Sequence, residues 1–335
     1  MLEGVHNRTY LIAEKNGYRW EGGCSGMDNT PRGRTTLFAT KERPNNPDML
    51  WIDAICQQTL VAKLISSFFS VLNDNEKEME WFKKFEEKRN IINSLYWNDE
   101  DEFYYDIDCN TLQHYKVMSI ASFWVLISEV APVEKAEILL KHLFNPKTIG
   151  GFVPFVSLSR NDNDYKVNGE YWRGSVWLPT AYATLKGIVK YGFYKEAQVL
   201  GSKLLNHMYK TFEQYSPHTI WECYSPEEYK PASAENEKNA VRPDFCGWSA
   251  LGPIAIYIEF VLGFHTINAF TNIVEWFKPE SVEGLIGIKN LRFGNIVTDI
   301  VADENKCTVI SNKDYTLIIN GNSFAVREGA NEIFL

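Results

Sequence analysis

Residues 48–72 read DMLWIDAICQQTLVAKLISSFFSVL, and this stretch carries the helical pattern on which the predicted fold is built. Its apolar residues recur at the spacing of one helix face, at Leu50, Ala54, Val61, Leu64, Ile65 and Phe68. Asn73 and Asp74 interrupt the run, and a charged amphipathic segment follows at about residues 76–95. The two segments predict a pair of antiparallel helices.

The helical pattern continues as far as Phe277. Further helices are predicted at residues 115–130, 133–144, 173–191, 193–212 and 246–264. The last of these is apolar on nearly every face, so we expect it to be buried all round. Long polar loops follow every second helix, at 145–171 and 214–246. In an α/α toroid such loops gather on one face and form a cleft, which predicts a mainly α, toroid-type domain over residues 1–277.

Two stretches favour β structure. Residues 96–108, YWNDEDEFYYDID, are too acidic and aromatic for a helix and are expected to form a loop or hairpin. After Phe277, short β-rich runs alternate with turns, and Asn320-Gly321 is a strong hairpin signal. A small C-terminal β domain is therefore predicted over residues 278–335.

Charge and hydropathy exclude several partner classes. The net charge is −9 and no basic run occurs, which argues against nucleic acid and anionic membrane surfaces. The longest apolar run, residues 250–264, is interrupted by Pro253 and Glu259 and is too short to span a bilayer. The opening residues lack the order of a signal peptide. We therefore expect a cytoplasmic protein with no membrane partner.

The residue types that commonly bind metals show no metal-binding spacing. The six cysteines contain no C-x-x-C pair and are expected to be reduced thiols. The six histidines are isolated, and residues 161–170, NDNDYKVNGE, lack the register of a calcium loop. No metal and no other cofactor is therefore expected.

Aromatic residues make up 14% of the chain. Such residues serve cores first, and the alternative is a cleft whose rings stack on sugars. Many of them gather with Gly and carboxylates in clusters at residues 20–32, 51–53, 169–177, 221–227 and 245–251. Inverting hydrolysis of a glycosidic bond needs one protonated carboxyl to donate to the leaving oxygen and one ionised carboxylate to activate water. The clusters supply these residue types, but composition leaves the pair open among 43 acidic residues.

Four motifs occur in a specific order: SGMDNTPR (25–32), YWRGSVWLPTAY (171–182), WECYSPE (221–227) and GWSAL (247–251). Together they resemble glycoside hydrolase family 63, which includes processing α-glucosidases and mannosylglycerate-type hydrolases and is related to the trehalases. The resemblance runs from about Trp20 to Phe264. It implies an (α/α)6 toroid of twelve helices and inverting hydrolysis of α-linked glucosides or mannosides without a catalytic metal.

The resemblance implies that Asp28 is the general acid and Glu222 the base. A turn role for Asp28 is the alternative, and Glu227 and Glu170 are rival bases. The candidate substrate contacts are Trp20, Asn29, Arg32, Asp53, Glu170, Tyr171, Trp172, Arg173, Trp177, Tyr224 and Trp248. For Arg173, a helix cap or a pair with Glu170 is equally open. Asp53 is either a buried structural acid or a cleft residue, and Trp172, Trp177 and Trp248 are expected to be partly core.

The chain departs from the family pattern in two ways. The family's Glu before the Ser-Gly pair is replaced by Cys24, with Glu21 nearby, and the pattern predicts about seven helices instead of twelve. We therefore expect the C-terminal part of a longer enzyme. Helices that lack partners on one flank predict self-association, or a need for an N-terminal segment.

Two other functions stay open at this point. The first is a non-catalytic carbohydrate-binding relic whose toroid does not close. The second is a sugar epimerase or isomerase on the same toroid, which works through His acid–base pairs. Neither His207 nor His218 lies in a motif of that kind.

Overall fold

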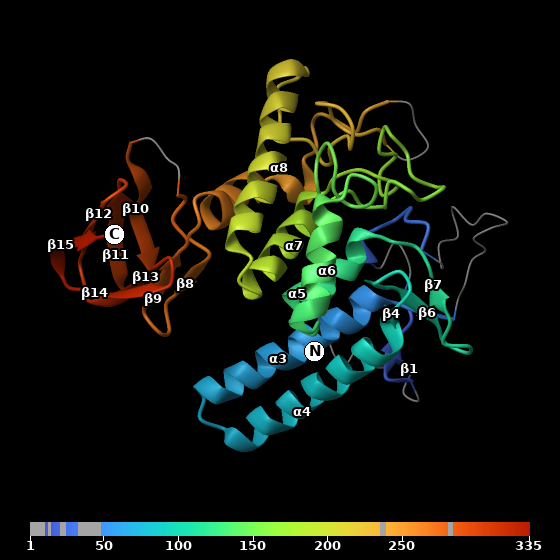
Figure 1. Cartoon of the computed structure of the whole chain (residues 1–335), viewed down its shortest axis with the longest axis horizontal. Helices are drawn as coiled ribbons and strands as arrows, with labels where there is room; N and C mark the ends of the chain where they lie inside the picture. The colour runs from blue at the N-terminus through green and yellow to red at the C-terminus, as the bar shows by residue number, and fades with distance from the viewer. Residues whose placement is uncertain (1–10, 13–14, 21–24, 33–47, 235–238, 281–283) are drawn as a thin grey trace. The chain divides into compact units, whose positions relative to one another are not determined.

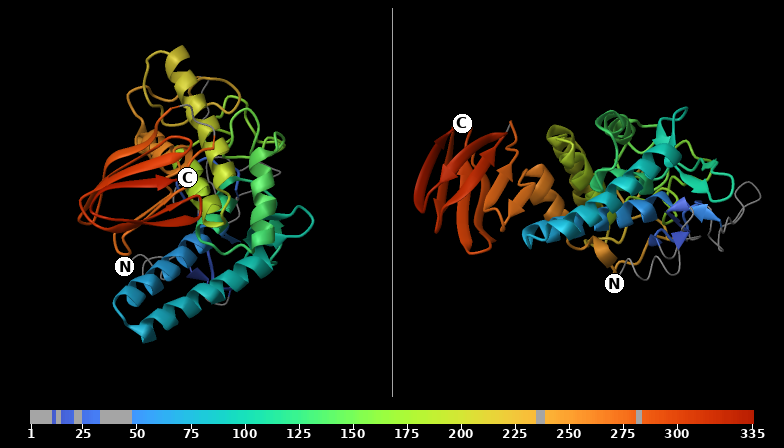
Figure 2. Two further views of the ribbon diagram at one scale, coloured as in Figure 1. Left: turned by 60° about the vertical axis from the view of Figure 1, so that its left-hand side comes forward. Right: turned by 90° about the horizontal axis from the view of Figure 1, so that it is seen from below.

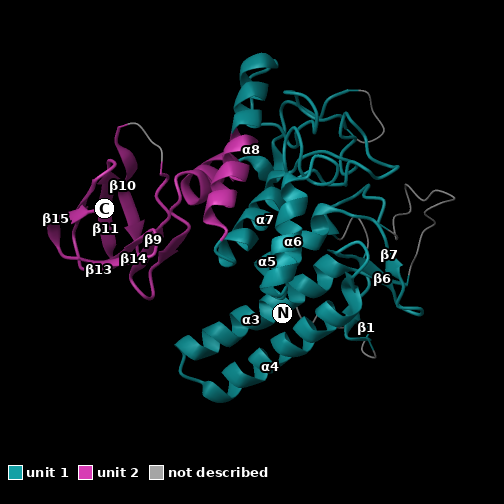
Figure 3. Ribbon diagram, in the orientation of Figure 1, with its two compact units in different colours: residues 1–192, 206–250 teal, residues 193–205, 251–335 magenta. Residues whose placement is uncertain are grey.

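The computed structural model describes residues 11–12, 15–20, 25–32, 48–234, 239–280 and 284–335. The chain divides into two compact units (Figure 3). The first unit contains residues 1–192 and 206–250, and the second contains residues 193–205 and 251–335. Cys24 and Glu21, which mark one predicted departure from the family pattern, lie outside the described residues.

The predicted helix pair at the start of the first unit is confirmed. Helices α3 (Ile52–Val71) and α4 (Asn75–Ile91) lie side by side (Figures 1 and 2). Asn73 turns the chain with a φ of 57°. Asp74 then caps α4 because its side chain accepts a hydrogen bond from the Lys77 backbone N–H. A π-helical turn, η2 (Ile92–Tyr96), follows α4 directly.

Short strands of the first unit pair as hairpins. Strands β1 (Leu11–Ile12) and β2 (Gly17–Tyr18) form one pair, and β4 (Trp97–Asn98) and β5 (Phe103–Tyr104) form another. A three-stranded sheet contains β3 (Met49–Leu50), β6 (Asp106–Asp108) and β7 (His114–Tyr115). The hairpin expected within residues 96–108 is therefore confirmed.

The helix predicted at 115–130 is largely wrong. That stretch contains β7, a 3-10 turn η3 (Ile120–Phe123) and a single helical turn α5 (Trp124–Ile127). Most of its apolar residues from Val117 to Val130 are buried, and Met118, Trp124 and Ile127 are partly exposed. A short, continuously apolar run does not distinguish a helix from other buried backbone, and here Ser119 pairs with Leu158 instead.

The later helices follow their predictions more closely. Helices α6 (Val133–Phe144), α7 (Leu178–Lys190) and α8 (Tyr194–Gln214) are present. Helix α7 begins after the predicted position because Val176 is held in bridges to Val156 and Tyr224. Pro179 lies in its first turn, where the missing N–H is tolerated. The left-handed Gly192, with a φ of 82°, follows its end.

The expectation of one fully buried helix at 246–264 is wrong. The segment consists of η4 (Gly247–Ser249), α9 (Gly252–Ile256) and η5 (Tyr257–Val261). The helix restarts at Gly252-Pro253, so the apolar residues divide into two faces. Ile256 and Phe260 are buried, whereas Leu251 is 74% and Ile254 60% exposed.

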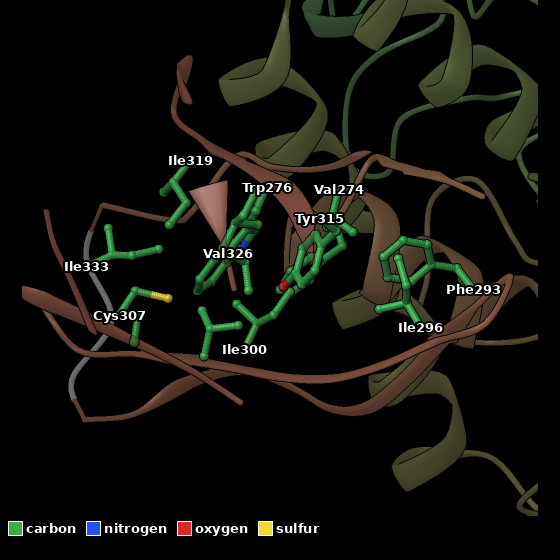
Figure 4. Packing of buried hydrophobic residues seen from close by; sticks show 14 of the residues in the cluster. Val274, Trp276, Phe293, Ile296, Ile300, Cys307, Tyr315, Ile319, Val326 and Ile333 are labelled. Carbon is green, nitrogen blue, oxygen red and sulfur yellow. The ribbon is translucent and has the colours of Figure 1, made fainter. Parts of the chain in front are cut away.

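The second unit contains two four-stranded sheets. One has the order β10 (Ile286–Phe293), β11 (Ile296–Ala302), β12 (Lys306–Ser311), β15 (Gly329–Phe334). The other has the order β14 (Asn322–Val326), β13 (Tyr315–Ile319), β9 (Ile273–Trp276), β8 (Thr266–Asn268). Side chains of both sheets, among them Trp276, Ile300 and Tyr315, share one hydrophobic core (Figure 4).

The second unit confirms one local prediction, and its β structure begins before the predicted boundary. Strands β13 and β14 are joined at Asn320-Gly321, whose positive φ angles of 48° and 84° suit a two-residue hairpin. However, β8 and β9 join the sheet of β13, so the β structure begins at Thr266, before the predicted boundary at 278. The predicted order of the fold, helical structure followed by β structure, is confirmed. The twelve-helix toroid stays a prediction.

Helix α3 is the one helix within the described ranges that is long and apolar enough to cross a bilayer. The same length and composition occur in core helices of soluble proteins. Its residues Ile52, Ile55 and Cys56 are fully buried, and it packs along α4. Burial therefore accounts for its apolar face near the N-terminal end.

Candidate active site

One pocket of the first unit brings together four of the sequence clusters. It has a volume of about 620 Å³ and is lined by Gly26, Asp28, Tyr171, Glu222, Phe245, Gly247 and Trp248. The lining residues come from four separate segments of the sequence. Two of the lining side chains are the predicted acid and the predicted base.

The segment that carries Asp28 is a compact turn. The Met27 N–H donates to the Ser25 hydroxyl, and the Thr30 N–H donates to the Met27 carbonyl. Gly26 adopts a φ of 74°, and a Cβ there would lie 2.7 Å from the Trp248 ring. Only glycine satisfies both conditions. The glycine of the SGMDN motif therefore allows this segment to lie against the indole of Trp248.

An ion cluster anchors the same segment in the protein interior. The Arg32 guanidinium makes two hydrogen bonds of 2.9 and 3.0 Å to Asp53 and two of 2.7 and 2.8 Å to Asp106. It also lies 4.4 Å from the ring centroid of Trp51. The side chains of Arg32 and Asp53 are only 1% and 2% exposed. We therefore correct the prediction that these two contact substrate, because their polar atoms are occupied by each other inside the protein.

The second segment of the pocket presents Tyr171. Its hydroxyl donates a 3.0 Å hydrogen bond to Glu222 Oε1. The Tyr171 ring packs edge-on against Trp177, and Trp177 stacks on Trp172 with an interplanar angle of 2°. Both indoles are buried. These tryptophans therefore support the ring of Tyr171 from within the protein.

The third segment holds Glu222 by its backbone. The Ser249 hydroxyl donates to the Glu222 carbonyl at 2.7 Å. Two residues later, Tyr224 exchanges both backbone hydrogen bonds with Val176, and its hydroxyl accepts from the Trp221 N–H. The backbone that carries Glu222 is therefore hydrogen-bonded to Ser249 on one hand and to Val176 on the other.

The two carboxyls of the pocket have different electrostatic environments. Burial raises the pKa of Asp28 above its ordinary value. Burial also raises the pKa of Glu222, and the charge of Asp28 adds to this, while the Tyr171 hydrogen bond and Arg242 oppose it. Desolvation favours the neutral carboxyl, and a donated hydrogen bond favours the ionised one. The pKa of both carboxyls is thus raised, and the rise at Glu222 is opposed by the Tyr171 hydrogen bond and by Arg242.

A family model for the mannosylglycerate hydrolase MGH1-like glycoside hydrolase domain matches residues 16–236. The chain belongs to this MGH1-like glycoside hydrolase family. The matched range contains Asp28, Tyr171 and Glu222. The resemblance to glycoside hydrolase family 63 is confirmed by this match together with the relatives below.

Two curated proteins and one solved structure are similar over most of the MGH1-like chain. An uncharacterized protein of Borreliella burgdorferi is 28% identical over 261 residues, which cover 76% of this chain and 54% of that protein. A mannosyl-oligosaccharide glucosidase of Saccharomyces cerevisiae is 25% identical, over 74% of this chain and 30% of its own. This chain thus spans about half of the first relative and about a third of the second.

The solved structure is described as a sialidase. It aligns with 99% of this chain and 28% of its own, with a TM-score of 0.70 and 12% sequence identity. At this level of identity the likeness concerns the fold alone.

The pocket of the MGH1-like domain includes four of the predicted site residues: Asp28, Tyr171, Glu222 and Trp248. Other candidates are buried and do not line it, namely Trp20, Asn29, Trp172, Trp177 and Tyr224. Glu170 and Arg173 are partly exposed but lie outside the lining. The rival base Glu227 is bound instead by Arg160 and Tyr165.

The sequence prediction missed three lining residues, Gly26, Phe245 and Gly247. Phe245 is half exposed, and Trp248 is 57% exposed. Two exposed aromatic rings thus lie beside the two carboxyls, and ligand sites typically combine apolar surface with a few polar groups in this way. The position of Phe245, directly before the GWSAL motif, was the signal that could have identified it.

The alternatives with metal or His chemistry find no additional support among the residues that the structure describes. These residues contain no group of three His, Cys, Asp or Glu side chains that is arranged to hold a metal ion. His207 is 1% exposed, and burial lowers its pKa to about 4. Its ring packs between Phe152, Tyr224 and Tyr229 and lies outside the pocket.

Proposed function

We propose that the chain hydrolyses α-linked glucosides or mannosides, of the oligosaccharide or glycosyl-glycerate type, with inversion at the anomeric carbon. The observation that carries the proposal is the single pocket lined by Asp28 and Glu222, in a chain of the MGH1-like family. The names of the family and of the yeast relative, a mannosyl-oligosaccharide glucosidase, support the sugar class.

The proposed reaction uses each carboxyl once. Asp28 donates its proton to the glycosidic oxygen as the bond to the anomeric carbon breaks. Glu222 accepts a proton from a water molecule, whose oxygen bonds to the anomeric carbon from the opposite face. Inversion requires that the two carboxyls lie about 6.5–9.5 Å apart, so that this water fits between them. Phe245 and Trp248 would contact the sugar ring.

The stereochemistry of the product tests this proposal. We expect proton NMR of a running reaction to show the β anomer of the released sugar first, followed by mutarotation. The substrates are mannosylglycerate, glucosylglycerate and α-linked oligosaccharides. Glu222→Gln should abolish the signal, whereas Glu227→Gln, which removes the rival base, should preserve it. First formation of the α anomer would contradict inversion. If the parent chain turns over none of these sugars but still binds them, the carbohydrate-binding relic is the better description.

We also propose that the isolated chain self-associates through α3. The second half of this helix exposes Leu64, Phe68, Val71 and Leu72, with Phe68 64% exposed. Large apolar patches of this kind usually mark contact surfaces. Light scattering should give a mass above the 38.6 kDa of one chain, and Phe68→Asp should reduce it. Phe270→Asp is the control, since Phe270 is 85% exposed but lies in the second unit. A monodisperse monomer at high concentration would contradict the proposal.

A cytoplasmic location of the protein stays a prediction.

A further inference from the structure

The proposed acid and base lie on separate segments, and the amide of one residue connects the segment of the acid to the residues on either side of Tyr171, which bonds to the base. Asn29, next to Asp28, is 1% exposed. Its Nδ2 donates to the Glu170 carbonyl at 2.8 Å, and its Oδ1 accepts from the Trp172 N–H at 2.7 Å. The two bonded backbone groups flank Tyr171. Asn29 therefore holds the backbone on both sides of the residue whose hydroxyl bonds to Glu222.

The backbone that Asn29 holds is strained. Glu170 and Tyr171 have φ angles of 35° and 65°, after Gly169 at 96°. Non-glycine residues at positive φ persist where the surroundings over-determine them. From the other side, Ser233 accepts hydrogen bonds from the Glu170 and Tyr171 N–H groups, through its hydroxyl and its carbonyl. The strap of residues 169–172 is thus clamped between Asn29 and Ser233.

We propose that Asn29 is a positioning residue: through the strap it sets where the Tyr171 hydroxyl, and with it the Glu222 carboxylate, lies relative to Asp28. The inference rests on the proposed roles of Asp28 and Glu222. It gives the Asn of the SGMDN motif a function distinct from the substrate contact expected from the sequence. Both polar atoms of its amide bond to backbone groups beside Tyr171, so it acts on the reaction through Tyr171.

The protonation of Glu222 reports on this coupling. The charged and titratable groups that face the Glu222 carboxyl are Tyr171, Asp28 and Arg242. Of these, Tyr171 donates the hydrogen bond that lowers the pKa of Glu222. If the strap relaxes when Asn29 is removed, that bond is lost and the pKa of Glu222 rises. Tyr171→Phe removes the same bond directly.

The experiment is an NMR titration of the full chain with 13C-labelled Glu, in which Glu222→Gln assigns the Glu222 carboxyl signal. We expect Asn29→Ala to raise the pKa of Glu222 in the same direction as Tyr171→Phe does. The double variant should show no further rise, because both changes remove one interaction. Where hydrolysis is measured, kcat should fall by about 10²-fold, the usual effect of a misplacement of about 1 Å, with a smaller change in KM.

Asn93→Ala is the matched control. Asn93 likewise bonds to two backbone groups, since its amide donates to the carbonyls of Arg89 and Val130, and it lies outside the pocket lining. It should lower the melting temperature while leaving the pKa of Glu222 unchanged. Asn29→Ser, which keeps a polar group, replaces Asn29→Ala if the latter does not fold.

The outcomes separate the two proposals. If Asn29→Ala lowers the melting temperature as Asn93→Ala does and leaves the Glu222 titration unchanged, the positioning role is overturned. If the Glu222 pKa rises but the parent chain hydrolyses no sugar, the coupling through Asn29 stands and the proposed hydrolysis falls.

Discussion

Asp28→Asn is expected to lower kcat for an unactivated α-glycoside by about 10²–10⁴-fold, the usual contribution of general acid catalysis. The amide keeps the size of the side chain and loses the proton that the leaving oxygen requires. Burial raises the pKa of Asp28, so the parent carboxyl holds this proton to a higher pH than an ordinary Asp. Steady-state kinetics of the two proteins on the same substrate provide the measurement.

The leaving group supplies the control for this prediction. Fluoride leaves a glycosyl fluoride without receiving a proton from an acid. Asp28→Asn should therefore reduce the hydrolysis of a glycosyl fluoride far less than that of an alkyl glycoside. Sugar affinity, measured by calorimetry, should be retained because the pocket keeps its shape. If the variant hydrolyses the alkyl glycoside at the parent rate, the acid is another residue.

Arg32→Met is expected to destabilise the fold by about 3–5 kcal/mol, the usual cost of breaking a buried ion pair from one side. It leaves Asp53 and Asp106 buried without their cation. Burial already raises the pKa of Asp106, and Arg32 opposes that rise. Without Arg32, the pKa of Asp106 in the folded state should rise further above its value in the unfolded state. Urea unfolding of both proteins measures the difference.

The pH dependence checks the cause of this loss. A carboxyl with a raised pKa in the folded state favours folding at low pH, and this contribution is lost as the pH rises through the folded pKa. The deficit of Arg32→Met should therefore be largest near pH 7 and shrink toward pH 5. Arg327→Met removes an exposed pair with Asp314 and should change the midpoint little. An equal deficit at both pH values would show that lost packing, and not charge, is responsible.

Local patterns in the sequence predict several elements of the fold. The helical spacing of the apolar residues in 52–71 matches the extent of α3, although Leu64 and Phe68 are exposed, and Asn73-Asp74 matches its turn. Asn320-Gly321 requires positive φ at two successive residues and therefore predicts the β13–β14 hairpin. The SGMDN motif likewise predicts the pocket position of Asp28 through its resemblance to a family. Each of these features depends on neighbours in the chain.

Other features depend on partners that no local pattern names. Asp106 binds Arg32 across 74 positions, and Tyr171 binds Glu222 across 51. The apolar segments 115–130 and 246–264 read as helices, yet bridges and a Gly-Pro restart interrupt them. Apolar periodicity reports that a residue is buried, but it does not report which group lies opposite. For this reason Arg32 and Asp53 were candidate cleft residues. The sequence shows only that both are charged, and the tertiary structure shows that they form a buried ion pair.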